Sequence, residues 1–214
     1  MKQLIIVGGG GLGRQALTQL AADLAHGTQW LIAGFLDERG PDAIAANSAF
    51  PWLGYPHTFC PQPQHVFISA VGNPASRRLQ VEPLVAKGAH FISIRTRCQL
   101  DLRTSHGATF FGYDVSFGVD CRVGDHGFIE QQTLVGHDVT IGDYVHISPR
   151  CVIAGYVTIG HGVVIHSGAL LARNITVGDD AVIGMGAVVL RDVPAGATMV
   201  GNPASVVFIK KGTN

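Results

Sequence analysis

The sequence predicts two parts of different architecture: a small domain that alternates strands with helices, followed by a parallel β-helix. Three observations support this division. An apolar residue recurs at every sixth position from Phe111 to Val189, a glycine-rich loop follows an apolar run near the N-terminus, and the 214 residues include 28 glycines but only 14% charged residues. Disordered chains and charge-rich helical bundles have the opposite composition, so the composition argues against both.

The six-residue repeat fills the C-terminal half of the chain. Its first positions are Phe111, Phe117, Val123, Ile129, Val135, Ile141, Ile147, Ile153, Ile159, Ile165, Leu171, Val177, Ile183 and Val189. A period of six fits neither an α-helix nor a simple strand, but it suits a β-helix in which each hexad forms one side of an 18-residue coil. We expect the large aliphatic residues to point into the prism and the small residues after them to let the chain bend between sides.

The N-terminal part follows another pattern, in which apolar runs alternate with helical segments. The expected strands are 4–7, 30–36, 65–71 and 90–94, and the expected helices are 14–26 and 75–87. Strands that alternate with helices form parallel sheets. We therefore predict a Rossmann-like domain at 1–95 and a β-helix domain with a C-terminal tail at 96–214.

A glycine-rich loop, Gly8–Gly13, fits the pattern G-x-G-x-x-G between the first strand and the first helix, and Asp37 and Glu38 close the next strand. Backbone N–H groups at such a loop approach a phosphate, and the acidic residue can accept ribose hydroxyls. A dinucleotide fold needs two such halves and this domain has about one, so a nucleotide-sugar suits it better than NAD. A tight turn that binds nothing remains the alternative.

A histidine at a corner of the predicted prism is the candidate catalytic residue. His137 is the third residue of its hexad, and Asp138 follows it directly. A neutral imidazole oriented by a carboxylate can take a proton from an attacking amine or hydroxyl, although a structural role is also open. Cys121 and Cys151 fall at inward positions of their hexads, which favours buried thiols over nucleophiles.

Charge and cysteine patterns narrow the range of partners. Fifteen basic and fifteen acidic residues cancel, which predicts no nucleic-acid or membrane-surface footprint. The four cysteines lack zinc-ligand spacing, so no metal site is predicted. With neither a signal-peptide core nor an 18-residue apolar stretch in the sequence, we expect a cytoplasmic protein.

Several motifs together resemble one family, the bacterial sugar acyltransferases of the sialic acid O-acetyltransferase type, which include acetyl-CoA-dependent N-acetyltransferases of nucleotide-linked 4-amino-4,6-dideoxy sugars. The resemblance rests on the glycine loop and on the segments 35–38, 71–77, 135–138, 141–146 and 201–204. It implies that the β-helix is left-handed. It also implies a homotrimer whose active sites lie between adjacent prisms.

The resemblance also implies roles for individual residues. His137 corresponds to the family's general base and Asp138 to its carboxylate partner. The acetyl-CoA contacts correspond to His146, Gly155, Ser167 and Met185, with the Gly155 N–H at the thioester oxyanion. The nucleotide-sugar pocket corresponds to Gly10, Gly11, Leu12, Asp37, Glu38 and Gly72.

One departure from the family bears on the acceptor. Many amino-sugar members carry histidine close to the acceptor where this chain has Leu12. The leading interpretation is N-acetylation of a nucleotide-linked amino sugar for surface glycan (lipopolysaccharide) biosynthesis. O-acetylation of a sugar of the sialic acid type, a non-catalytic nucleotide-binding scaffold and an NAD-dependent oxidoreductase are the alternatives.

Overall fold

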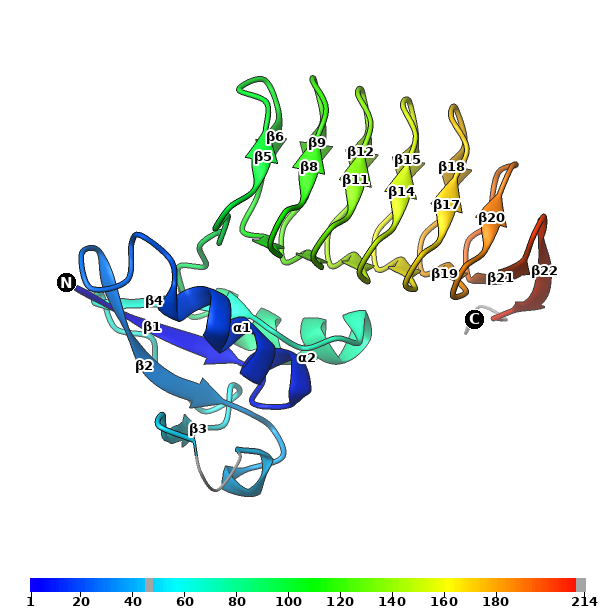
Figure 1. The fold of residues 1–214 in the computed structure, drawn as a ribbon. Coiled ribbons are helices and arrows are strands. Elements are labelled where there is room, and N and C mark those ends of the chain that lie inside the picture. The colour runs from blue at the N-terminus through cyan, green and yellow to red at the C-terminus, as the bar shows by residue number, and fades with distance from the viewer. Residues whose placement is uncertain (45–47, 211–214) are drawn as a thin grey trace. The chain divides into compact units, whose positions relative to one another are not determined.

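The computed structural model describes residues 1–44 and 48–210, which form two units (Figure 1). The first is Met1–Thr96 and the second begins at Arg97. A small parallel sheet with helices is followed by a parallel β-helix, so the predicted fold class is confirmed.

The first unit is a four-stranded parallel sheet in the order β3-β2-β1-β4. Its elements are β1 (Lys2–Val7), α1 (Gly11–Ala21), β2 (Trp30–Leu36), a short 3-10 turn (Pro41–Ala43), β3 (Trp52–Gly54), β4 (His65–Ser69) and α2 (Pro74–Val85). Apolar side chains of β1, β2, β4 and α2, among them Ile5, Leu36, Phe67 and Leu84, are buried together. The chain leaves β1 toward β2 on one side, while β4 lies on the other, so the strand order reverses at β1.

The bounds of most elements differ from the sequence prediction by a few residues, and three elements differ more. The first helix ends at Ala21 rather than at 26, because the Asp23 carboxylate accepts the Ala25 N–H (2.9 Å) and favours a turn there. The strand expected at 90–94 is a single bridge between Phe91 and Phe67. Strand β3 was not predicted, since its three half-buried residues show no alternation.

The second unit consists of three parallel sheets whose strands follow one another around the prism. The strands are β5 (Gln99–Leu100), β6 (Ser105–His106), β7 (Phe110–Phe111), β8 (Ser116–Phe117), β9 (Arg122–Val123), β10 (Phe128–Ile129), β11 (Leu134–Val135), β12 (Thr140–Ile141), β13 (His146–Ile147), β14 (Val152–Ile153), β15 (Thr158–Ile159), β16 (Val164–Ile165), β17 (Leu170–Leu171), β18 (Thr176–Val177), β19 (Val182–Ile183), β20 (Val188–Val189), β21 (Ala197–Gly201) and β22 (Ala204–Ile209). The sheets are β22-β21-β19-β16-β13-β10-β7, β20-β17-β14-β11-β8-β5 and β18-β15-β12-β9-β6. Among the strands that the structure describes, only β21 and β22 pair antiparallel.

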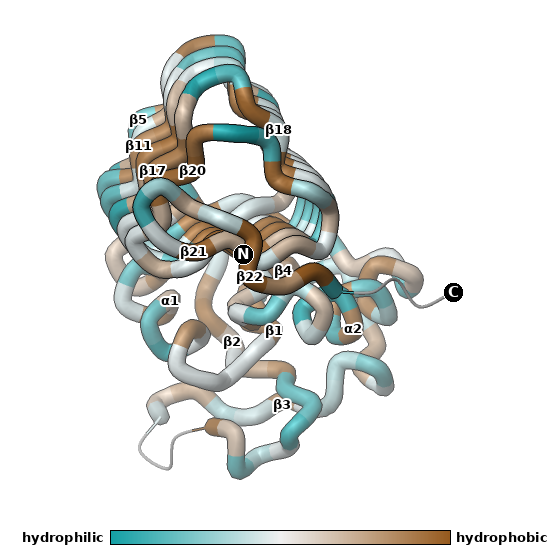
Figure 2. Tube along the Cα trace, turned by 90° about the vertical axis from the view of Figure 1, so that its right-hand side faces the viewer, coloured by the Kyte–Doolittle hydropathy of each residue, from teal (hydrophilic) through white to brown (hydrophobic). Residues whose placement is uncertain are grey.

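The six-residue repeat becomes an 18-residue coil, as predicted. Ile129 pairs with Ile147, and Ile147 pairs with Ile165 in the next coil. These first positions are fully buried, and Figure 2 shows hydrophobic segments that recur at the same places in successive coils. The first coil is irregular: His106 pairs with Val123, 17 residues away.

The chain bends at a different position of the hexad from the one expected. The fourth residue adopts the left-handed conformation in every hexad from Asp114 to Gly186, with φ between 55° and 62° where it is not glycine. The second-position glycines serve another purpose. A Cβ at Gly136 would lie 2.6 Å from the Gly155 nitrogen, and one at Gly112 equally close to the Gln131 nitrogen, so these glycines allow neighbouring coils to approach.

This distinction predicts unequal effects of substitution. A Cβ at Gly142 would lie 2.8 Å from the backbone of Gly160 and His161, so Gly142→Ala should destabilise the fold by about 1–3 kcal/mol. Gly186 is left-handed with open space around its Cβ direction, and Gly186→Asn should cost less, because asparagine tolerates that conformation. Urea unfolding of both variants tests this, and an equal or smaller loss for Gly142→Ala contradicts it.

Candidate functional site

His137 and Asp138 form an exposed pair at the corner that follows β11. The His137 Nδ1 atom lies 2.7 Å from Asp138 Oδ2, and the two side chains are 51% and 41% exposed. A carboxylate only accepts hydrogen bonds, so in the neutral imidazole Nδ1 carries the proton and Nε2 presents a lone pair. Asp138 occupies the left-handed fourth position, with φ 56°, and its N–H donates to the Val119 carbonyl (2.9 Å), which fixes the corner.

The next coil supports the imidazole ring. A Cβ at Gly155 would lie 2.8 Å from His137 Nε2, so only glycine leaves the ring its space. The Tyr156 ring meets the His137 ring edge to face, with centroids 4.9 Å apart. The sequence analysis placed Gly155 at the site but missed Tyr156. The signal was available, because residues 18 or 19 positions on from His137 lie on the following coil.

The other residues expected to contact acetyl-CoA lie elsewhere on the chain. Ser167 and Met185 line a groove of about 550 Å³ along the corner that follows β10, β13, β16 and β19. The corner that carries His137 follows a different sheet, so one chain does not join these residues to His137.

His146 has a third environment, outside the groove. Its side chain is 10% exposed, its Nε2 lies 3.2 Å from Glu130 Oε1, and its ring stacks on Phe128 with centroids 6.0 Å apart. Within one chain, the residues predicted to bind the donor are therefore distributed over separate parts of the prism.

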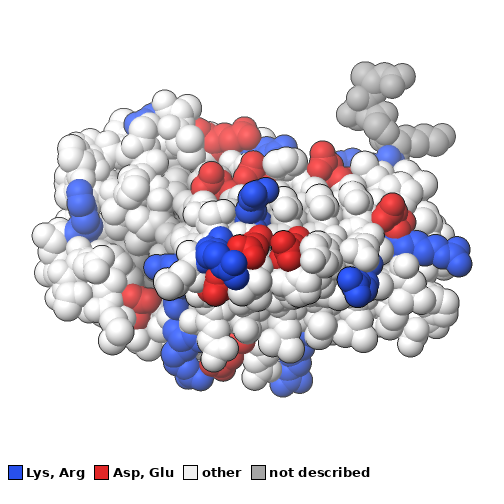
Figure 3. All heavy atoms as spheres, turned by 90° about the horizontal axis from the view of Figure 1, so that it is seen from above, with Lys and Arg blue, Asp and Glu red and all other residues white. Residues whose placement is uncertain are grey.

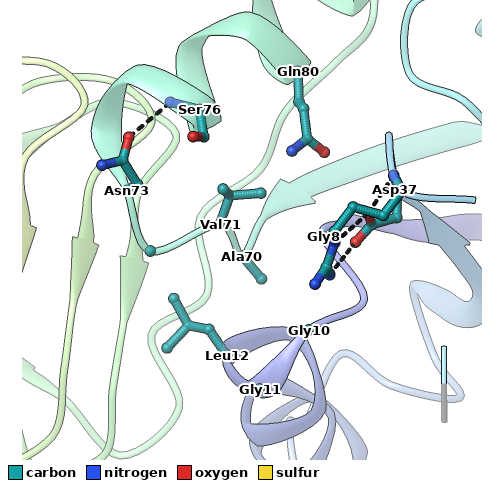
Figure 4. A pocket seen from close by; sticks show the side chains of 12 residues that line it. Gly8, Gly10, Gly11, Leu12, Asp37, Ala70, Val71, Asn73, Ser76 and Gln80 are labelled. Atoms are coloured by element: carbon teal, nitrogen blue, oxygen red, sulfur yellow. Dashed lines mark hydrogen bonds and ion pairs between the residues drawn. The ribbon is translucent and has the colours of Figure 1, made fainter. Parts of the chain in front are cut away.

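A second cavity, of about 380 Å³, lies in the first unit at the carboxyl ends of β1, β2 and β4. This is where the strand order reverses, the position at which open α/β sheets bind ligands. Its lining is Gly8, Gly10, Gly11, Leu12, Asp37, Arg39, Ala70, Val71, Gly72, Asn73, Ser76 and Gln80 (Figure 4). Five of the six residues predicted to bind the nucleotide-sugar are thus together, while Glu38 is not in this lining and lies 2.9 Å from the His57 ring.

The glycine loop is held in place by Asp37. The Asp37 side chain is only 1% exposed, and its Oδ2 accepts the Gly9 N–H (2.8 Å). Arg39 donates to the same carboxylate from its backbone N–H, Nε and Nη2 at 2.8–2.9 Å. Burial acts to raise the pKa of the Asp37 carboxyl, but the Arg39 and Gly9 hydrogen bonds outweigh it, so this pKa is lowered. The sequence analysis did not identify Arg39, because no sequence motif predicts a functional cation two residues after Asp37.

Three further features of the described residues concern surface charge, metal ligands and helices that could span a membrane. On the face seen in Figure 3, acidic and basic side chains lie side by side among uncharged residues. Within 1–44 and 48–210, no group of three His, Cys, Asp or Glu side chains could hold a metal ion. The helices in the same residues are too short or too polar to cross a membrane.

Comparison with known proteins gives two family matches. Residues 3–84 match the PglD N-terminal domain, and residues 156–191 match the bacterial transferase hexapeptide repeat. No curated protein matches the sequence.

Solved structures are similar over nearly the whole chain. The acetyltransferase domain of PglB from Neisseria gonorrhoeae, in complex with acetyl coenzyme A, is 27% identical, with a TM-score of 0.85 over 96% of this chain and 99% of that one. A perosamine N-acetyltransferase mutant from Caulobacter crescentus, in complex with CoA and GDP-perosamine, is 22% identical, with a TM-score of 0.86 over 96% and 97%. WeeI from Acinetobacter baumannii is 23% identical, with a TM-score of 0.80 over 97% and 100%.

The coiled fold and the match over residues 156–191 define the second unit as a hexapeptide-repeat domain of the bacterial transferase type. The chain is an acetyltransferase of this class, with an N-terminal domain of the PglD type. This identification removes the NAD-dependent oxidoreductase and the non-catalytic scaffold from the alternatives that the sequence left open.

Two cysteines of the β-helix lie in its core and take no part in this site. Cys121 and Cys151 are fully buried. Burial raises the pKa of the Cys121 thiol and raises that of Cys151 to about 11, so their nucleophilic thiolates are scarce at neutral pH. Cys60 is exposed.

These environments predict selective thiol labelling. At pH 8 about one Cys151 side chain in a thousand is ionised, so iodoacetamide should label Cys60 quickly and leave Cys121 and Cys151 unmodified until the protein unfolds. Peptide mass spectrometry of native and urea-treated protein measures this. Rapid labelling of Cys151 in the native protein contradicts the buried environment.

Proposed function

We propose that the protein transfers an acetyl group from acetyl-CoA to the amine of a nucleotide-linked amino sugar, as a step in surface glycan biosynthesis. The coarser function, sugar acetylation, has the support of the similar acetyltransferases. The observation that carries the mechanism is the His137–Asp138 pair at an exposed corner, with Nε2 left to act as a base.

The reaction needs one base and one site for negative charge. As the amine nitrogen attacks the thioester carbonyl carbon, its proton passes to His137 Nε2 and the charge moves to the carbonyl oxygen. The C–S bond then breaks, and the His137 imidazolium returns the proton to the departing CoA sulfur. Asp138 stabilises the imidazolium between these steps, and the Gly155 N–H is the proposed donor to the oxyanion.

Two copies of the prism are required for the complete site under this proposal. Ser167 and Met185, proposed to contact the pantetheine and adenosine parts of acetyl-CoA, lie on a different corner from His137. A neighbouring copy in a homotrimer supplies the second corner, together with its His146. Apolar side chains exposed on the sheet between corners, including Leu134, Val152 and Leu170, support burial against another copy.

The acceptor is proposed to bind in the cavity of the first unit. Backbone N–H groups around Gly10 and Gly11 at the start of α1 suit a diphosphate. The apolar wall at Leu12 offers no hydrogen bond to an amine. Transfer to a sugar hydroxyl, as in sialic acid O-acetylation, is therefore the second candidate, and it uses the same base.

Loss of the base should slow the reaction without unfolding the protein. His137→Ala removes a half-exposed side chain, so acetyl-CoA affinity and the unfolding temperature should change little, while kcat should fall by about a hundredfold or more. Asp138→Asn should cost less, because it leaves the base present and retains the corner. Full turnover by His137→Ala at saturating acceptor rules out the proposed mechanism.

The glycine loop allows a separate test of the acceptor pocket. No atom lies within 4 Å of a Cβ built at Gly11, so Gly11→Val projects into the cavity and spares the fold. We expect a rise of at least tenfold in the KM for the nucleotide-sugar and an unchanged KM for acetyl-CoA. Equal effects on both KM values, or none on either, place the acceptor elsewhere.

A further inference from the structure

We propose that Arg39 and Gln80, rather than Asp37, recognise the nucleotide base, and that they select bases with a carbonyl next to a ring N–H. This inference rests on the proposed function, because it takes the cavity of the first unit to hold a nucleotide-sugar. It concerns two residues that the sequence patterns did not identify.

The first step is that the Asp37 carboxylate is already fully engaged. Its Oδ1 accepts from the Arg39 N–H and Nε, both at 2.9 Å, and its Oδ2 accepts from the Gly9 N–H and Arg39 Nη2, both at 2.8 Å. Two oxygens offer about four acceptor sites, so none is left for a ribose hydroxyl. Displacement of Arg39 would leave a buried carboxylate short of partners, which is unfavourable.

The second step is that the hydrogen bonds to Asp37 hold the Arg39 side chain where it can contact a ligand in the cavity. The hydrogen bonds from the Arg39 side chain to Asp37 use Nε and one N–H of Nη2. The Nη1 group and the second Nη2 proton are not used in these bonds. Arg39 lines the cavity and its side chain is 63% exposed. Its Nη2 lies 3.0 Å from the position that a Cβ atom on Gly10 would occupy. A guanidinium held in this way can donate its remaining N–H groups to a carbonyl or anionic oxygen of a ligand.

The third step concerns the opposite wall, which α2 supplies. Asn73, Ser76 and Gln80 follow one another at spacings of three and four along this helix, so they share the face toward the cavity. Asn73 is used as the helix cap, where its Oδ1 accepts the Ser76 N–H (2.9 Å). Figure 4 shows the Gln80 carboxamide pointing into the cavity, and its Oε1 is buried without a hydrogen-bond partner. A buried acceptor without a partner calls for a donor from the ligand.

The two walls together define the chemistry of the bound group. Arg39 offers donors and the Gln80 Oε1 lacks one, and the lactam edge of uracil, thymine or guanine complements both with a carbonyl beside a ring N–H. Adenine has no carbonyl, and cytosine has no ring N–H next to its carbonyl. Nucleotides of the first three bases should therefore bind better than those of the other two.

Calorimetry on the intact protein with UDP, dTDP, GDP, ADP and CDP tests the proposal. We expect at least one of the first three to bind at least tenfold more tightly than both ADP and CDP. Gln80→Met, which keeps the length but removes the carboxamide, should reduce that preference to less than threefold. Arg39→Ala should weaken the preferred nucleotide by at least tenfold.

Matched variants separate recognition from structural damage. Gln15→Met on α1 and Arg78→Ala on α2 change exposed residues outside the cavity lining and should leave all five affinities unaltered. If Gln80→Met lowers the unfolding temperature, Gln80→Glu provides a second variant, which keeps an acceptor but loses the donor and should retain discrimination against CDP.

The outcomes distinguish this inference from the function on which it rests. If none of the five nucleotides binds, the nucleotide-sugar acceptor is wrong and the inference fails with it. If nucleotides bind but ADP or CDP is as tight as the others, or if Gln80→Met leaves the ranking intact, the inference is overturned while a nucleotide-sugar acceptor stands.

Discussion

Close approach between successive coils is the constraint on which the β-helix depends. Backbone N–H groups of one coil donate to carbonyls of the next, as from Gly136 to Ile153 (2.7 Å) and from Gly142 to Ile159 (2.8 Å). Glycine at the second position of many hexads is the residue that permits this spacing, because a Cβ there would meet the neighbouring backbone. With the first and fifth positions buried inside the prism, the corners are left to carry chemistry.

The glycine loop of the first unit likewise depends on one set of hydrogen bonds. Asp37 is buried at the end of β2, and its hydrogen bonds tie the glycine loop and Arg39 to one point. A buried carboxylate is tolerated only when it is paired and hydrogen-bonded. Asp37 therefore has a structural role, in which it holds the glycine loop and Arg39 in position. Among the described residues of the cavity lining, backbone N–H groups, the Arg39 guanidinium and polar side chains of α2 remain available to a ligand.

The sequence was informative wherever a pattern had a single physical cause. Fourteen apolar positions at a spacing of six have no explanation in a helix or an alternating strand, and they predicted the coils and their buried residues. The reason for the glycines was not predictable in this way, because both a bend and a close approach require glycine. Only the backbone angles and the neighbouring coil distinguish the two.

The site could be predicted only in part for a similar reason. Chain order places Asp37 and Glu38 equally well at the end of a strand, but only the structure shows that one is inside the cavity lining and the other pairs with His57. Gln80 carries no motif, since its role depends on the face of α2 that the fold turns toward β1 and β2. Ser167 and Met185 lie on another corner from His137, so no pattern within one chain could show how they would meet.

Asp138 shows how the fold and the chemistry share one residue. The fourth position of every hexad from Asp114 to Gly186 is left-handed, and aspartate and asparagine tolerate that conformation better than most residues. At other coils Asp120 and Asp180 satisfy this demand alone, without a neighbouring histidine at the third position. At this corner the aspartate also accepts a hydrogen bond from His137 Nδ1, so the bend in the coil places a carboxylate beside the proposed base. The proposed catalytic pair therefore needs no distortion of the repeat, only a histidine at a corner whose turn residue is already acidic.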